Sequence, residues 1–134
     1  MVDLDLRKLS APVEALRPEL SAAYKRLDAK WDEIVKCLKS LPIPSSISFT
    51  HDHNEWNPED FSCIVWRKYN GKKRICIEVH IFNPNSNPYT DYDVTTTPYE
   101  EWSGEQRIDM LEHVPGLFAA AEKATREFIE KTQN

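Results

Sequence analysis

The sequence predicts an α+β fold of two layers, in the order α-β-β-β-α. An antiparallel sheet of three to four strands is expected to carry long N- and C-terminal helices packed on one face. Two observations predict this fold. Apolar residues recur at helical spacing near both ends of the chain, and two β-patterned runs between them flank an Asn-Gly pair. An amphipathic helix needs a surface to cover, and one face of a sheet supplies it.

An apolar stripe predicts a long helix from Pro18 to Leu41. Its members alternate spacings of four and three, which places them on one side of a helix: Leu20, Tyr24, Leu27, Trp31, Ile34, Leu38 and Leu41. Pro18 suits the first turn, and the prolines after Leu41 end the helix. Val13 and Leu16 extend the stripe upstream, which predicts a shorter helix from Ser10 or a kinked continuation. The same spacing is also what a seam between two chains requires.

The centre of the chain predicts a β-hairpin. The runs 61–69 and 72–82 flank Asn70-Gly71, a pair typical of two-residue turns that need positive φ at both positions. Such a turn pairs Tyr69 with Lys72, and the remaining pairs follow by counting. One face, predicted to be the core face, then carries Ser62, Ile64, Trp66, Ile75, Ile77 and Val79. The opposite face carries Phe61, Cys63, Val65, Arg67, Arg74, Cys76, Glu78 and His80.

Further strands are predicted on either side of the hairpin, over 46–50 and 89–96. Pairing of Phe82 with Tyr89 is expected, which would place Tyr92 and Val94 on the core face and Asp91 opposite His80.

The C-terminal region is predicted to be helical. Capping-box patterns begin at Thr97 and at Ser103, and either could start the helix. Apolar residues then recur at spacings of three and four, and Pro115-Gly116 predicts a break followed by a second helix to about Lys131.

Composition narrows the classes of function. The chain has 134 residues, a formal charge of −5 and a charged fraction of 29%, which predicts a single domain over 1–134 that does not bind nucleic acid non-specifically. No run approaches the length of a membrane span, and the N-terminus lacks the pattern of a signal peptide. The three cysteines form no CxxC pair, which favours reduced thiols and a cytoplasmic location.

The stretch from Ser46 to Phe61 contains a candidate metal site. His51 and His53 lie two residues apart on a predicted strand, where they would point to one side, and Glu55 could complete a ligand set. The spacing matches no complete metal signature. A polar loop at one end of the sheet is the favoured interpretation, and a small metal-dependent hydrolase is the alternative.

The face opposite the core face is the predicted binding surface. Arg67 and Arg74 would lie directly opposite each other and repel, unless an anion, a nearby carboxylate or an acidic partner lies between them. The residues assigned to this surface are Phe61, Val65, Arg67, Arg74, Glu78 and His80. His80 with a carboxylate resembles an acid–base pair, but no nucleophile accompanies it.

The sequence alone therefore does not establish a function. The favoured hypothesis is a small cytoplasmic binding or regulatory module that recognises a protein partner or a second copy of itself. Neither catalysis nor a cofactor is expected. Two alternatives stay open: the hydrolase, and a sensor that holds an anionic small molecule between Arg67 and Arg74.

Overall fold

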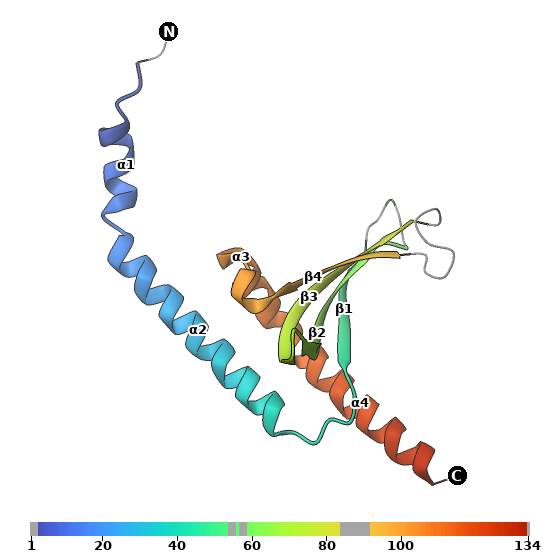
Figure 1. Ribbon diagram of the computed structural model, residues 1–134. Helices are drawn as coiled ribbons and strands as arrows, with labels where there is room; N and C mark the ends of the chain where they lie inside the picture. The colour runs from blue at the N-terminus through green and yellow to red at the C-terminus, as the bar shows by residue number, and fades with distance from the viewer. Residues whose placement is uncertain (1–2, 54–55, 57–58, 84–91, 134) are drawn as a thin grey trace. The chain divides into compact units, whose positions relative to one another are not determined.

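The computed structural model describes residues 3–53, 56, 59–83 and 92–133. It confirms the predicted α+β class: helices stand at both ends of the chain, and four antiparallel strands form one open sheet between them (Figure 1). The chain divides into two compact units, Met1–Ile34 and Val35–Asn134, so the single-domain assignment stays a prediction. None of the described helices combines the length and the apolar character that crossing a membrane requires.

The N-terminal unit consists of α1 (Leu6–Glu14) and most of α2 (Arg17–Ser40). Asp5 caps α1 by accepting a hydrogen bond from the Lys8 amide at 3.4 Å. A separate helix precedes α2, but it begins at Leu6 and not at Ser10 as predicted. The apolar side chains of this region are 53–71% exposed at Leu6, Leu9, Val13, Leu16 and Leu20.

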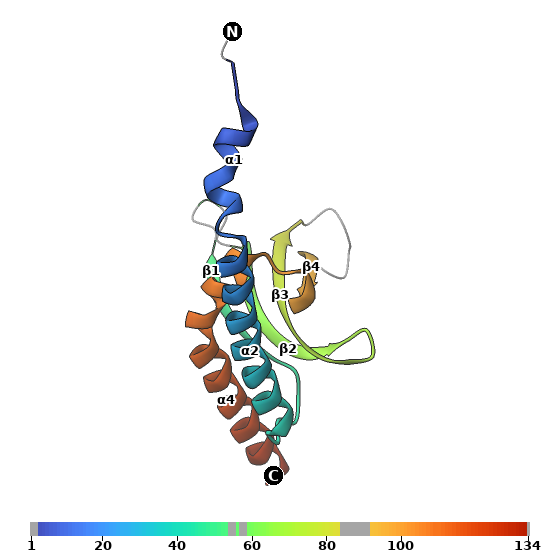
Figure 2. The same cartoon turned by 90° about the vertical axis from the view of Figure 1, so that its left-hand side faces the viewer.

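The sheet has the strand order β1 (Ile47–His53), β2 (Phe61–Tyr69), β3 (Lys72–Phe82) and β4 (Tyr92–Pro98). The predicted hairpin register is confirmed throughout, from Tyr69 opposite Lys72 to Phe61 opposite His80. Asn70 and Gly71 have φ of 51° and 89°, as the two-residue turn requires. β2 and β3 curve together along their length (Figure 2).

The predicted register of the fourth strand is wrong. Phe82 pairs with Tyr92, three residues beyond the expected partner, and His80 pairs with Val94. Because successive side chains point to opposite faces, an odd shift exchanges the faces. Tyr92 and Val94 therefore share the face of His80 instead of the core face. Asp91 lies outside the described residues.

A β-bulge interrupts β1 near its end. Thr50 pairs with Cys63 and Asp52 with Ser62, so His51 is an extra residue between them. The bulge interrupts the alternation of side chains between the two faces of the sheet, which the sequence did not predict.

The core face of the sheet packs against the C-terminal helices. Ile64, Trp66 and Ile75 are at most 2% exposed. Ser103 forms the predicted capping box with Gln106 at the start of α3 (Gly104–Asp109). Short 3₁₀ segments, η1 (Tyr99–Glu101) and η2 (Met110–His113), precede α3 and α4 (Val114–Thr132) respectively. α4 contacts β1, which fixes this helix on the core face.

α4 lies close to β1 at Gly116. A Cβ atom at this position would lie 2.6 Å from the ring of Phe49, which is closer than van der Waals contact allows. The absence of a side chain therefore lets α4 rest directly on β1.

Gly116→Ala is expected to destabilise the protein by about 1–3 kcal/mol through overpacking, although alanine favours a helix over glycine by about 1 kcal/mol. Phe49→Leu should relieve part of this penalty, so the two substitutions should be non-additive in denaturant unfolding. A Gly116→Ala variant as stable as the parent chain would contradict the packing argument.

Candidate functional site

The outer face, defined as the sheet face opposite α4, has a buried centre. Cys63 and Val65 are each 3% exposed and Cys76 is fully buried. Phe61 and Tyr69 pack against these three residues from the two ends of β2. The centre of the outer face is therefore an apolar cluster.

Glu78 is the polar centre of the outer face. One carboxylate oxygen, Oε2, lies 2.9 Å from Arg67 Nε and accepts a 3.4 Å hydrogen bond from Thr96 Oγ1. The other oxygen, Oε1, lies 3.3 Å from His80 Nε2. The Glu78 side chain is only 12% exposed, so these neighbours replace most of its hydration.

Arg67 and Glu78 interact mainly through their opposite charges. Arg67 Nε is buried and makes no well-directed hydrogen bond, although it lies 2.9 Å from the Glu78 carboxylate. The pair offsets the cost of holding a carboxylate away from water.

An aromatic patch continues the outer face beyond Glu78. The rings of Phe61 and His80 stack with centroids 4.4 Å apart and an interplanar angle of 9°. The edge of Tyr92 meets both rings, at 5.7 Å from Phe61 and 6.1 Å from His80. Phe82 contacts Tyr92 at 5.7 Å, and Val94 is the partner of His80 across the strands. The patch comprises Phe61, His80, Phe82, Tyr92 and Val94.

Each of the two facing arginines pairs with its own carboxylate. Arg67 lies opposite Arg74, as predicted, but Arg67 pairs with Glu78. Arg74 donates to the Tyr69 carbonyl at 3.1 Å and to Glu100 at 2.8 Å. The repulsion predicted from sequence is therefore relieved within the chain. Nothing among the described residues favours an anion between the arginines, and the sensor hypothesis stays a prediction.

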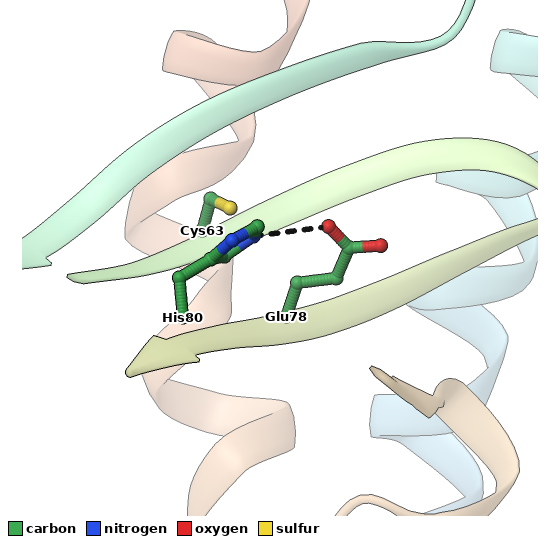
Figure 3. A group of neighbouring side chains, drawn as sticks. All are labelled: Cys63, Glu78 and His80. Carbon is green, nitrogen blue, oxygen red and sulfur yellow. Dashed lines mark hydrogen bonds and ion pairs between the residues drawn. The ribbon is translucent and has the colours of Figure 1, made fainter. Parts of the chain in front are cut away.

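Cys63, Glu78 and His80 bring three kinds of donor atom together. Their sulfur, oxygen and nitrogen atoms all lie within 4.8 Å of one another. The three side chains project from β2 and β3 on the side away from α4 (Figure 3). Burial and the neighbouring Glu78 carboxylate raise the pKa of the Cys63 thiol to about 11. Burial likewise raises the pKa of Cys76 to about 11. Both thiols are protonated at neutral pH, so neither is a ready nucleophile.

His51 and His53 have different neighbours. His51 stacks on His113 of η2, with ring centroids 4.7 Å apart, on the side of α4. His53 is exposed, pairs with Phe61 and lies 6.4 Å from its ring. The bulge at His51 breaks the alternation that would have placed both imidazoles on one side. Glu55 lies outside the described residues, and the hydrolase hypothesis stays a prediction.

The predicted binding residues lie in different settings. Phe61, Arg67, Glu78 and His80 come together as one connected group. Val65 is buried beneath them, and Arg74 turns toward Glu100. Sequence reasoning missed Thr96 and Tyr92, because the register assumed for the fourth strand put other residues opposite β3.

Comparison with known proteins provides no further guide to this site. No protein-family model matches the chain, and neither the curated proteins nor the solved structures contain a significant match. The functional argument therefore rests on the geometry of the site.

The stacked histidines predict a dependence of stability on pH. Burial, and next the charge of His113, lower the pKa of His51 from 6.5, while Asp52 and Glu112 act in the opposite direction. The unfolded chain therefore binds more protons than the folded chain near and below pH 6.5, and stability falls as the pH falls. His51→Gln should flatten this decline in urea unfolding measured across that range. A decline of unchanged steepness in the variant would show that His51 is not its source.

Proposed function

We propose that this chain is a non-enzymatic binding module that recognises a protein partner through its outer face. One observation carries the proposal: the aromatic patch runs from the half-buried stack of Phe61 and His80 to exposed apolar side chains. Val94 is 50% exposed and Phe82 is 38% exposed. Contiguous apolar surface next to polar and charged groups is typical of a protein interface.

The edge of the sheet suggests how a partner binds. β4 is hydrogen-bonded to β3 and to no other described strand. The opposite edge strand, β1, is interrupted by the bulge at His51 and contacted by α4, which protects it from further pairing. An extended segment of the partner would add to the edge of β4, with alternate apolar side chains over Val94 and the patch.

The chemistry of the outer face supports binding in preference to catalysis. The Cys63 and Cys76 thiols are protonated at neutral pH because burial raises their pKa to about 11. Glu78 and His80 resemble an acid–base pair, but the described residues provide no activated nucleophile beside them. The three unpaired thiols fit the proposed cytoplasmic location, because disulfides are rare in a reducing compartment.

Self-association is a second proposal, carried by the N-terminal unit. Leu6, Leu9, Val13, Leu16 and Leu20 recur at spacings of three and four, and all are more than half exposed. The stripe runs along α1, crosses the turn at Leu16 and reaches the first turn of α2. A second copy of the same stripe is the proposed occupant, because alternating spacings of three and four let two helices interlock along one seam.

Photo-crosslinking tests the outer face. A photoreactive amino acid at position 94 should capture a discrete protein in cells, whereas the same group at position 95, exposed on the opposite face of β4, should not. The captured protein, once purified, should then lose at least about tenfold in affinity for Val94→Lys but not for Thr95→Lys, because a charge would enter the apolar contact. Equal crosslinking at both positions, or equal affinity of both variants, would contradict the proposal.

Sedimentation tests self-association. The parent chain should sediment as a dimer at micromolar concentration, and Val13→Glu should shift it to a monomer by placing a charge in the seam. Ala11→Glu is the matched control, because residue 11 lies on the opposite side of α1 by helical spacing and should leave the dimer intact. A monomeric parent chain, or dissociation caused by Ala11→Glu alone, would rule out the stripe as the interface.

A further inference from the structure

Beyond partner binding, we propose that Cys63, Glu78 and His80 form a zinc site on the outer face. The proposal rests on three different donor atoms that lie close together: the Cys63 sulfur, a Glu78 oxygen and a His80 nitrogen are within 4.8 Å of one another. Sulfur, imidazole nitrogen and carboxylate oxygen are the ligands that zinc uses in proteins. Hard cations such as Mg²⁺ and Ca²⁺ prefer oxygen ligands alone, so this donor set selects against them.

The distances are close to those of a tetrahedral site. Glu78 Oε1 and His80 Nε2 are 3.3 Å apart, which is about the separation of two ligands that each lie ~2.0–2.1 Å from a tetrahedral zinc. Zinc–sulfur bonds are longer, at about 2.3 Å, which places the sulfur of a tetrahedral site about 3.5 Å from the other two donors. The three donor atoms lie within 4.8 Å of one another, so Cys63 has to close a gap of at most about 1.3 Å.

Neighbouring side chains hold the ligands in place. Arg67 and Thr96 engage Oε2 of Glu78, which leaves Oε1 facing His80. Phe61 covers one face of the His80 ring, and stacking leaves the in-plane nitrogen available to a metal. Residues that orient ligands in this way are a regular part of metal sites.

Zinc binding requires the Cys63 thiol to change its protonation state. The Cys63 thiol loses its proton to solvent and binds as a thiolate, as zinc coordination requires. The dication then meets one thiolate and one carboxylate, while Arg67 stays paired with Oε2 of Glu78. Three ligands from the described residues leave the fourth tetrahedral position to a further ligand.

Cobalt substitution tests the site on the whole chain. Co²⁺ added to the metal-free protein should give tetrahedral ligand-field bands and a thiolate-to-cobalt charge-transfer band, and Zn²⁺ should displace it with one ion per chain. Cys63→Ala should abolish the charge-transfer band and weaken zinc binding at least about tenfold. Cys76→Ala is the matched control, since this buried cysteine lies on the same face outside the trio, and it should keep both.

Further variants distinguish this zinc site from other metal sites on the chain. Cys63→Ser, a near-isosteric change, and His80→Gln provide further ligand variants whose folding is checked by circular dichroism. A parent spectrum without a thiolate band, or a band that survives Cys63→Ser and disappears with Cys37→Ala, would overturn the site. Zinc retained by these variants and lost in His53→Ala would assign the metal to the other histidines. Because the readout needs no partner, its failure is distinct from failure of the proposed protein interface.

Discussion

The turn at Asn70-Gly71 is the constraint on which the rest of the sheet depends. Both residues adopt positive φ, and a loop of two residues leaves the chain no freedom to slip. β2 and β3 are the two central strands, so their register determines both faces at once. A slip of one residue would move Trp66 and Ile64 out of the core and bring Arg67 into it.

The register of the hairpin also determines which residues lie on the outer face. Cys63 lies opposite Glu78 and Phe61 lies opposite His80, because the two residues of each pair are equally far from the turn. β4 then adds Thr96 beside Glu78 and Val94 beside His80. The polar trio and the aromatic patch are therefore neighbours on adjacent strands, and His80 belongs to both: its nitrogen faces Glu78 while its ring stacks on Phe61.

Local rules explain which parts of this arrangement were predictable from sequence. The hairpin register and four of the site residues followed from one turn. β4 is separated from β3 by residues 83–91, a connection too long for its length alone to determine the register of β4. The resulting error of three residues hid Tyr92 and Thr96 from the predicted site. The bulge at His51 was equally invisible, because its sequence contains no glycine or proline to mark it.

The stability of the sheet alone does not account for the polar trio. Glu78 is only 12% exposed, and removing a carboxylate from water costs free energy that its pairing with Arg67 at best offsets. Replacing a buried ion pair with apolar residues is often neutral or stabilising, and Val65 and Cys76 on the same face show that this sheet accommodates apolar side chains at its centre. Packing accounts for Cys63 in the apolar cluster and for the His80 ring stacked on Phe61, but not for the carboxylate of Glu78 beside them. Coordination of an ion, as proposed above, would give Glu78 a role beside the thiol and the imidazole.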